Sequence, residues 1–354
     1  MAISIKISKT TQSRIHLCDF ENIEFGKIFS DHMFRVDYFD GSWQNPSIIP
    51  YGPIEISPSL SALHYGQSIF EGMKAFKNQE GAPQLFRPLD NIKRLNISAL
   101  RMGMPEIPED LFLDGLNQLV SLDRNWIPTK EGSALYLRPF MFATDDFVGV
   151  RPSLNYSFII FCCPVNSYYP LPIKVRVEKK YVRASTGMAG YAKAAGNYGI
   201  SMLPTSEAKK DGYDQIIWTD GINHNFVEES GTTNLFFVMD DKLVLTPKLD
   251  GNILEGITRD SCIKLLKAEG YTVEERNISI HEIIEAAKSG ELTDVFGTGT
   301  AAIIAKIAAI GLDGIDYELP DSEKRKVSSW LFKTIYDIQT GKANDVFNWV
   351  KVIS

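Results

Sequence analysis

The chain has 354 residues, 44 % of them hydrophobic and 23 % charged, so it can bury a substantial core and form two domains. Its formal net charge is −7, and its lysines and arginines are scattered, which argues against a nucleic-acid-binding protein. It has no run of about 18 apolar residues for a membrane span and no apolar N-terminal block typical of a signal peptide.

The cysteines predict a reducing compartment. Cys162 and Cys163 are vicinal and cannot easily form an ordinary disulfide, and the four cysteines include no Cys-x-x-Cys motif. The isoleucines at positions 3, 5 and 7 alternate as in a strand, which favours a folded N-terminus over an organelle presequence. We therefore expect a cytoplasmic protein.

In the first half of the chain, residues 91–102 have the apolar spacing of a helix, and the runs 136–140 and 156–161 predict buried strands. Between residues 163 and 172, three prolines and two tyrosines interrupt this pattern. We expect a smaller N-terminal α+β domain (1–169), an interdomain connection (170–173) and a larger C-terminal domain (174–354).

The second half mixes short strands with helices without a regular βαβ alternation, which is typical of an α+β or mixed α/β fold. A helix is expected from soon after Lys193 to about residue 210, kinked at Pro204. Two more helices are expected, over 258–269 and from about residue 321. Short strands are expected at 174–177, 215–218, 234–238 and 242–245, with turns at Asp220–Gly221 and Asp240–Asp241.

Lys193 is the only formally charged side chain between Arg183 and Glu207, in a stretch rich in glycine and alanine. Such small neighbours leave room for a bulky group against the amine. A lysine amine shielded from water keeps a nucleophilic, unprotonated fraction, as Schiff-base chemistry with carbonyls or pyridoxal phosphate (PLP) requires. The alternative is a lysine at a helix start that extends past alanines to solvent. This stretch alone does not decide between them.

Two adjacent acids, Glu228 and Glu229, precede the apolar strand pattern that begins at Asn234. Neighbouring side chains of an extended chain point to opposite sides, so one glutamate would face water and the other inward. An inward acid needs a cationic partner, and a protonated pyridine nitrogen would serve. On local grounds, a pair of exposed turn glutamates is the more common arrangement.

Two glycine-containing segments could hold an anion. Gly256-Ile257-Thr258 is at a predicted helix start, where N–H groups and a hydroxyl can bind phosphate, although an ordinary N-cap threonine is the simpler explanation. Residues 297–302 follow an apolar strand and could approach an anion or form a tight turn. They also match G-x-G-x-x-A, but Gly311 and Gly314 follow too soon for a dinucleotide-binding unit, so an NAD enzyme is a minor alternative.

Other catalytic motifs have little support. The five histidines show no HExxH motif and no paired spacing, so no metal site is expected. The sequence also lacks a G-x-S-x-G elbow and a P-loop. Arg94, on the first predicted helix, could bind a phosphate through two N–H groups, although a surface arginine is more common.

Taken together, the sequence resembles the branched-chain amino acid aminotransferases, PLP enzymes of fold type IV. The resemblance spans nearly the whole chain and implies the two-domain fold of the D-amino acid aminotransferase type. It rests on the segments around Lys193 and Glu229 and on residues 25–33, 63–75, 85–88, 135–140, 163–165 and 296–301.

The resemblance implies the cofactor contacts. Lys193 would form the internal aldimine and, once released, move the proton between the substrate Cα and the cofactor C4′. Glu229, rather than Glu228, would keep the pyridine nitrogen protonated, and Tyr198 would lie near the phenolic oxygen. The phosphate would be held by Arg94, the backbone at Ile257 and Thr258, and Thr300.

The resemblance also implies the reaction, a reversible amino transfer between L-leucine, L-isoleucine or L-valine and 2-oxoglutarate. Aromatic residues would surround the substrate side chain, although some could be ordinary core residues: Phe29, Tyr65, Phe70, Tyr136 and Tyr168. Because a buried carboxylate needs a partner, Arg138 would bind the side-chain carboxylate of glutamate. Backbone groups near Thr300 and Ala301, with Thr232, would hold the α-carboxylate.

Tyr168 would reach the pocket of a neighbouring subunit, so a homodimer is expected. The chain departs from the family in two places. Ala302-Ile303-Ile304-Ala305 replaces the redox Cys-x-x-Cys of the mammalian members, so no thiol regulation is expected, and Met188 stands where glycine is common. Two alternatives remain: a sister activity of the same fold (D-amino acid aminotransferase or aminodeoxychorismate lyase), or a PLP-carrying binding protein without catalysis.

Overall fold

The computed structural model describes residues 4–169, 171–239 and 242–353, which fall into two compact units. The first contains the chain up to Tyr168, the short segment Ala192–Gly196 and the chain from Tyr336 on. The second contains Tyr169–Tyr191 and Asn197–Ile335. These units differ from the predicted division at 170–173, because two segments from the second half of the chain pack with the first unit. Residue 170 of the predicted connection lies outside the described residues.

The first unit is built on one sheet with the strand order β1-β3-β2-β8-β7-β5-β6-β18, and β4 pairs with β7. All pairings are antiparallel except that of β1 with β3. The strands are β1 (Lys6–Ile7), β2 (His32–Phe39), β3 (Ser42–Pro50), β4 (Ser68–Phe70), β5 (Met73–Lys77), β6 (Pro83–Phe86), β7 (Ala134–Ala143), β8 (Tyr156–Val165) and β18 (Val350–Val352). The helices are η1 (Ile15–Leu17), α1 (Ser61–Tyr65), α2 (Pro88–Arg101), α3 (Glu109–Leu122) and η2 (Arg124–Trp126).

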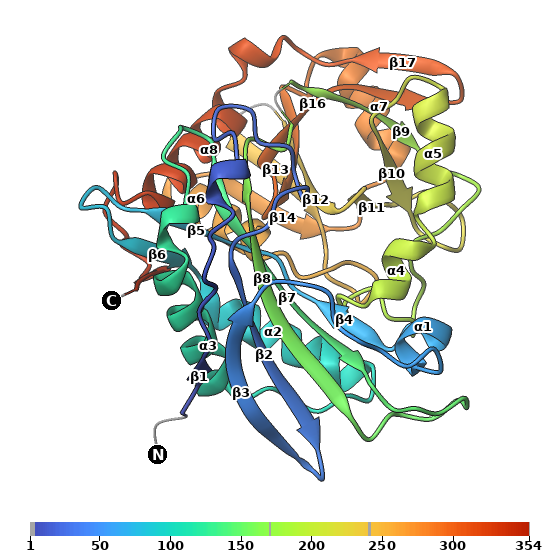
Figure 1. The fold of residues 1–354 in the computed structure, drawn as a ribbon. Coiled ribbons are helices and arrows are strands. Elements are labelled where there is room, and N and C mark those ends of the chain that lie inside the picture. The colour runs from blue at the N-terminus through green and yellow to red at the C-terminus, as the bar shows by residue number, and fades with distance from the viewer. Residues whose placement is uncertain (1–3, 170, 240–241, 354) are drawn as a thin grey trace. The chain divides into compact units, whose positions relative to one another are not determined.

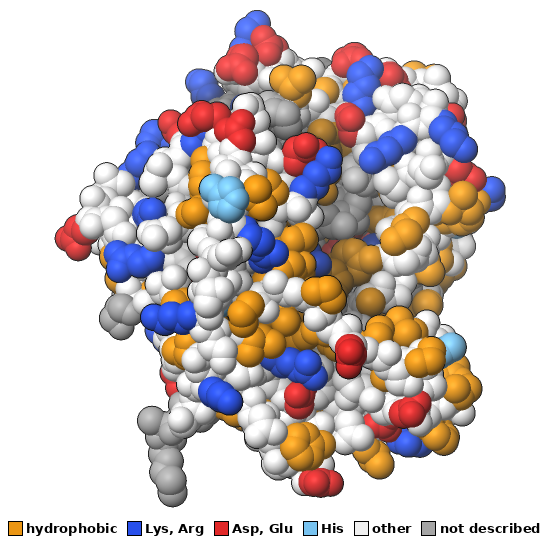
Figure 2. Space-filling view, in the orientation of Figure 1, with side chains coloured by type: hydrophobic (Ala, Val, Ile, Leu, Met, Phe, Trp, Pro, Cys, Tyr) orange, Lys and Arg blue, Asp and Glu red, His pale blue; other side chains and the backbone are white. Residues whose placement is uncertain are grey.

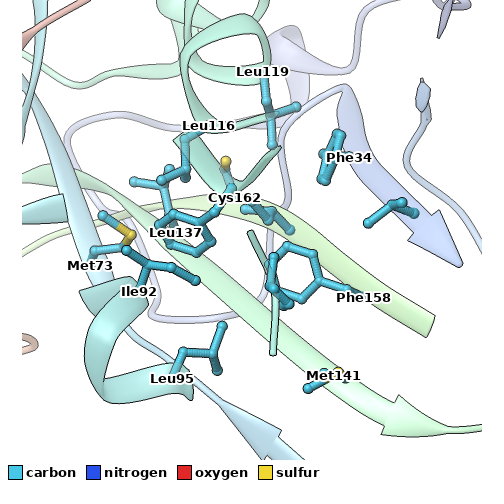
Figure 3. Packing of buried hydrophobic residues seen from close by; sticks show 14 of the residues in the cluster. Phe34, Met73, Ile92, Leu95, Leu116, Leu119, Leu137, Met141, Phe158 and Cys162 are labelled. Atoms are coloured by element: carbon cyan, nitrogen blue, oxygen red, sulfur yellow. The ribbon is translucent and has the colours of Figure 1, made fainter. Parts of the chain in front are cut away.

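The core of the first unit lies between this sheet and two amphipathic helices, α2 and α3, which contact each other (Figure 1). Pro88 occupies the first turn of α2, where its missing N–H costs no hydrogen bond. Ile92, Leu95 and Ala99 then follow at helical spacing and are fully buried. Figure 3 shows Ile92 and Leu95 near Leu137, Met141 and other apolar side chains of the sheet.

The second unit contains a sheet with the order β11-β10-β9-β16-β15-β12-β13-β14, and β17 pairs with β16. Because β11 also pairs with β12, six of these strands close into a ring, which leaves none of the six with an open edge. The strands are β9 (Ile173–Val177), β10 (Gln215–Thr219), β11 (Val227–Ser230), β12 (Thr233–Val238), β13 (Leu243–Pro247), β14 (Thr272–Arg276), β15 (Asp294–Gly299), β16 (Ile303–Leu312) and β17 (Ile315–Glu318). The helices are α4 (Ala195–Gly199), α5 (Met202–Lys210), α6 (Ile257–Ala268), α7 (Ile280–Ser289), η4 (Ser322–Lys324) and α8 (Lys326–Gln339). α4 and α8 each extend into segments of the first unit.

Most predicted elements are confirmed, with shifted ends. The structure has the following elements close to their predicted positions: α2 (predicted over 91–102), β7 (136–140), β8 (156–161), β9 (174–177), β10 (215–218), β12 (234–238), β13 (242–245) and α6 (258–269). The final helix begins at Lys326, after a 3-10 turn that Asp321 caps. The predicted turn at Asp220–Gly221 is present, whereas Asp240–Asp241 lies outside the described residues.

Two predictions are wrong, and a third is confirmed in part. The helix after Lys193 consists of α4 and α5, separated at residues 200–201, and Pro204 lies in the first turn of α5, where it causes no kink. The proline-rich interruption was placed too early, since β8 includes Cys163 and Pro164. Of the predicted glycine-containing segment, residues 297–299 extend β15, and residues 300–302 form the predicted turn.

No helix within the described ranges is long and apolar enough to cross a membrane. On the face shown in Figure 2, basic and acidic side chains are interspersed among the described residues, without a continuous basic stripe.

Candidate active site

Lys193 is held by its backbone inside the first unit. Its N–H donates to the Ser98 hydroxyl on α2 (2.8 Å), and its carbonyl accepts the N–H of Phe70 on β4 (3.1 Å). A bridge between Ile69 and Ala194 extends this contact. The side chain is half-buried, and its Nζ lies 4.8 Å from the centre of the Phe70 ring. The lysine is therefore fixed between a strand and a helix, and an extended snorkelling side chain does not describe it.

Glu71 follows Phe70 and is completely buried in the same unit. Its two oxygens accept Nε and Nη2 of Arg94 at 2.7 and 2.8 Å, and Asn91 Nδ2 donates to Oε2 at 2.8 Å. Burial alone would raise the pKa of Glu71, but Arg94, Lys193 and Asn91 outweigh it and hold the pKa below its usual value. Arg94, for which a surface position was the more common expectation, is 8 % exposed. Glu71 has no local sequence signal of a functional residue, because its partners Asn91 and Arg94 lie about 20 residues away in the chain.

Arg138, Tyr136 and Phe70 form one cluster in the first unit. The Arg138 guanidinium lies 4.6 Å from the Phe70 ring centre, and its Nη2 donates to the Tyr136 hydroxyl at 3.0 Å. Its buried Nε has no hydrogen-bond partner within the part of the chain that the structure describes. A Cβ on Gly72 would collide with the Tyr136 hydroxyl, so glycine is needed there. The cluster thus presents a buried cationic donor beside aromatic rings.

The other predicted aromatic residues are less closely grouped. Tyr168 and Tyr136 both make edge contacts with Phe25, which the sequence analysis did not place in the pocket. Phe29 stacks on Tyr51 instead. Tyr65, at the end of α1, is 43 % exposed. Contacts with Arg138 and Phe25 therefore link Phe70, Tyr136 and Tyr168, whereas the ring contacts of Phe29 and Tyr65 are with other residues.

In the second unit, Glu229 on β11 is buried, and both of its carboxylate oxygens have polar partners. Its Oε1 accepts the Leu254 N–H at 2.7 Å and Asn234 Nδ2 at 3.2 Å. Its Oε2 lies 3.0 Å from Arg183 Nε, in an ion pair rather than a well-aligned hydrogen bond. Arg183 also donates to the carbonyl oxygens of Gly190 and Asn252, and so connects the strand to two loops.

The prediction that one of the two acids faces water is wrong, because Glu228 is as deeply buried as Glu229. Alternation along β11 does turn the two side chains to opposite sides, but neither side is open to water. Glu228 Oε1 accepts Asn252 Nδ2 at 3.1 Å, while its buried Oε2 has no partner among the described residues. Burial raises the pKa of Glu228 to about 7, against the opposing effects of Arg183 and Asn252.

The predicted phosphate-binding segment is the start of α6. Gly256 is the N-cap residue, so no side chain at that position caps the first N–H groups of the helix. Thr258 is 8 % exposed. A Cβ on Gly256 would overlap the Asn234 side chain, which also contacts Glu229. Asn234 therefore links the helix start to the buried acid within one unit.

The remaining predicted residues of the second unit lie in turns and a short helix. Thr300 and Ala301 form the half-buried turn between β15 and β16, Thr232 is exposed before β12, and Tyr198 is half-buried in α4. Ile303, directly after that turn, has φ of 61°, a left-handed conformation that is costly for a β-branched residue. The G-x-G-x-x-A segment thus leads into the antiparallel strand β16 and not into a helix, which excludes the dinucleotide-binding alternative.

These residues fit the groups of PLP. The start of α6 offers backbone N–H groups and the Thr258 hydroxyl, which suit a phosphate. The buried, ion-paired Glu229 suits a cationic ring nitrogen. In the first unit, the glycine-flanked Lys193 segment supplies an amine and α2 supplies Arg94. Lys193 and Arg94 belong to the first unit, and Glu229 and Thr258 belong to the second. Within each unit, contacts among its own residues hold these side chains.

Comparisons with known proteins agree with this chemistry. The family model "Amino-transferase class IV" matches residues 68–310. "Branched-chain-amino-acid transaminase 1" of Bacillus subtilis is 45 % identical over 336 residues, which cover 94 % of each chain. "Branched-chain-amino-acid aminotransferase" of Mycolicibacterium smegmatis is 41 % identical and covers 93 % of this chain and 92 % of that protein.

Solved structures show the same similarity. The branched-chain amino acid aminotransferase from Escherichia coli has a TM-score of 0.72 and 27 % identity, over 91 % of this chain and 99 % of that one. The branched-chain amino acid aminotransferase from T.th., complexed with N-(5'-phosphopyridoxyl)-L-glutamate, has a TM-score of 0.73 and 25 % identity, over 90 % and 98 % of the two chains.

Proposed function

Because the chain belongs to the class IV aminotransferase family, we propose that it transfers amino groups between branched-chain L-amino acids and 2-oxoglutarate, with PLP as cofactor. The predicted family and its mixed α/β fold class are confirmed. The names of relatives at 41 to 46 % identity over nearly the full chain support the substrate class. The observation that carries the proposal is the Lys193 amine beside the Phe70 ring, with the Arg138 guanidinium against the same ring.

Seven residues would hold the cofactor. Lys193 would bind its aldehyde carbon, Glu229 its ring nitrogen and Tyr198 its phenolic oxygen, while the phosphate would contact Arg94, Ile257, Thr258 and Thr300. When bound, PLP supplies an electron sink for the negative charge that develops at a substrate Cα. The closed contacts of Glu229 with Arg183, Leu254 and Asn234 support its role, because they keep the carboxylate charged and oriented.

The protein's own side chains would carry the proton chemistry. The Lys193 Nζ atom accepts the proton from the substrate Cα and returns it during the second half of the reaction. Its backbone hydrogen bonds to Ser98 and Phe70 limit the positions that the amine can reach. Glu229 holds a proton on the ring nitrogen.

Substrate binding would use the cluster in the first unit. Phe70, Tyr136 and Tyr168 would contact the branched side chain, as would Phe29 and Tyr65, and Thr232 and Ala301 would lie near the α-carboxylate. The unpartnered Nε of Arg138 supports its role as the partner of the glutamate side-chain carboxylate. We propose a homodimer in which Tyr168 lies near the partner's pocket. The cytoplasmic location stays a prediction.

The two half-reactions test this proposal separately. L-Leucine is added to the purified holoprotein without acceptor, and the absorption band of the bound cofactor is followed before and after 2-oxoglutarate is added. We expect the band to bleach with L-leucine and to return with 2-oxoglutarate, and the Lys193→Ala variant to show no such cycle. A response to D-alanine but not to L-leucine would replace the proposal with the sister D-amino acid activity. A wild-type protein that binds PLP and turns over no amino acid would indicate a binding protein.

A further inference from the structure

Glu71 is a buried charged side chain of the first unit that the proposed chemistry does not use. It has no exposed surface. A buried carboxylate is costly unless its oxygens are paired, and here both oxygens are paired. Nε and Nη2 of Arg94 make two parallel contacts at 2.7 and 2.8 Å, the two-pronged geometry that fixes a guanidinium plane.

The carboxylate is itself held from two further directions. Asn91, three residues before Arg94 on α2, donates to Oε2 at 2.8 Å, and the Gly72 N–H lies 3.2 Å from the same oxygen. Asn91 Nδ2 also lies 3.4 Å from the Gly72 carbonyl oxygen. The strand segment 71–72 and the helix α2 are thus joined by one polar network with Glu71 at its centre.

This network restricts Arg94. A long arginine side chain has several rotatable bonds, and its binding of an anion depends on the guanidinium being oriented in advance. Two hydrogen bonds to one buried carboxylate remove most of that freedom. The pairing could instead act mainly as a counter-charge, which would weaken the attraction of Arg94 for an anion. The two roles predict opposite effects when Glu71 is replaced.

We propose that Glu71 is a positioning residue, which fixes the Arg94 guanidinium for binding of the cofactor phosphate through Asn91-supported, bidentate hydrogen bonds. The inference rests on the proposed function in that Arg94 is taken as a phosphate ligand. We take orientation as the main effect because Arg94 and Asn91 hold both oxygens of the carboxylate, so the guanidinium plane is fixed before an anion binds.

The test compares PLP with pyridoxal, which lacks the phosphate, as ligands of the full-length cofactor-free chain. Dissociation constants are measured by quenching of tryptophan fluorescence, so the readout does not depend on activity. For Glu71→Gln we expect the preference for PLP over pyridoxal to fall about 10-fold, as for one lost charge-assisted hydrogen bond. For Asn91→Ala, which keeps both charges, we expect a fall in the same direction of about 3-fold. The matched control is Asp90→Asn, a more exposed carboxylate on the same helix that pairs with Arg87, and it should leave the preference unchanged.

Each other outcome overturns the inference. Equal losses of affinity for PLP and pyridoxal would show that Glu71 only supports the fold. A stronger preference for PLP in Glu71→Gln would show that Glu71 acts as a counter-charge. If Glu71→Gln does not fold, Asn91→Ala is the deciding variant. An unchanged preference for PLP over pyridoxal in Asn91→Ala would then contradict the inference. A wild-type chain that does not distinguish PLP from pyridoxal would instead contradict the proposed cofactor contacts.

Discussion

Arg183 Nε lies 3.0 Å from Glu229 Oε2, and both side chains are at least nine-tenths buried. Arg183 is fixed in turn by the carbonyl oxygens of Gly190 and Asn252. An arginine held by the backbone thus forms an ion pair with a carboxylate inside the second unit. A carboxylate held in this way can pair with a cationic nitrogen of a ligand, whereas a solvated glutamate would be screened by water.

Replacing Arg183 by glutamine should destabilise the protein by about 3–5 kcal/mol, because it leaves a buried carboxylate without its cation. The affinity for PLP should fall as well. The free energy of unfolding is measured by urea titration of the cofactor-free chain. Arg276→Gln is the control, since Arg276 pairs with the partly exposed Glu274 and Glu282 and should contribute about 1 kcal/mol or less. Equal losses in the two variants would contradict the importance of the buried pair.

Gly256→Ala should weaken both the fold and the binding of PLP. The new Cβ would overlap the Asn234 side chain, so Asn234 would move away from Glu229. We expect a loss of about 1–3 kcal/mol, typical of overpacking, measured by thermal unfolding with and without PLP. Gly52→Ala is the control, because nothing lies within 4 Å of its added Cβ and its backbone is not left-handed. A Gly256→Ala protein as stable as Gly52→Ala would show that this close contact is not needed.

The stability of the protein should fall as the pH rises from about 4.5 through about 7, because of Glu228. Burial raises its pKa from 4.5 to about 7, so the folded protein binds this proton more tightly than the unfolded chain does. The contribution of Glu228 to the free energy of unfolding is complete at low pH. Up to about 3 kcal/mol of it is lost as the carboxyl group ionises.

Glu228→Gln should remove this part of the pH dependence and stabilise the protein at pH 8. Urea unfolding of the wild type and the variant at several pH values measures the difference, with the exposed Glu269→Gln as control. Parallel stability curves for wild type and Glu228→Gln would show that Glu228 does not titrate in this range.

Arg138→Met should distinguish the amino acceptor 2-oxoglutarate from the amino donor L-leucine. Methionine keeps much of the apolar contact with Phe70 but removes the guanidinium. We expect the KM for 2-oxoglutarate to rise about 10- to 100-fold, as for the loss of a charged hydrogen bond, with a small effect on L-leucine. Steady-state kinetics with both substrates measure this, and Arg35→Met, on the same sheet, is the control. Similar losses for both substrates would assign Arg138 to packing instead.

The sequence determined the parts of this protein that depend on local pattern. Apolar periodicity located α2, α6 and the strands β7 and β8, because the spacing of buried side chains follows from the geometry of each element. The absence of other charges near Lys193 likewise made that residue a candidate for binding a cofactor or substrate.

Only the tertiary structure decided which charges are buried and what they pair with. Glu71 and Arg94 are 23 residues apart, and Glu229 meets a backbone N–H 25 residues away. Local alternation predicted one inward and one outward glutamate on β11, but strands on both sides and the loop at Asn252 bury both. The burial of a side chain depends on residues that are distant in the chain and adjacent in the fold, so the local sequence cannot specify it.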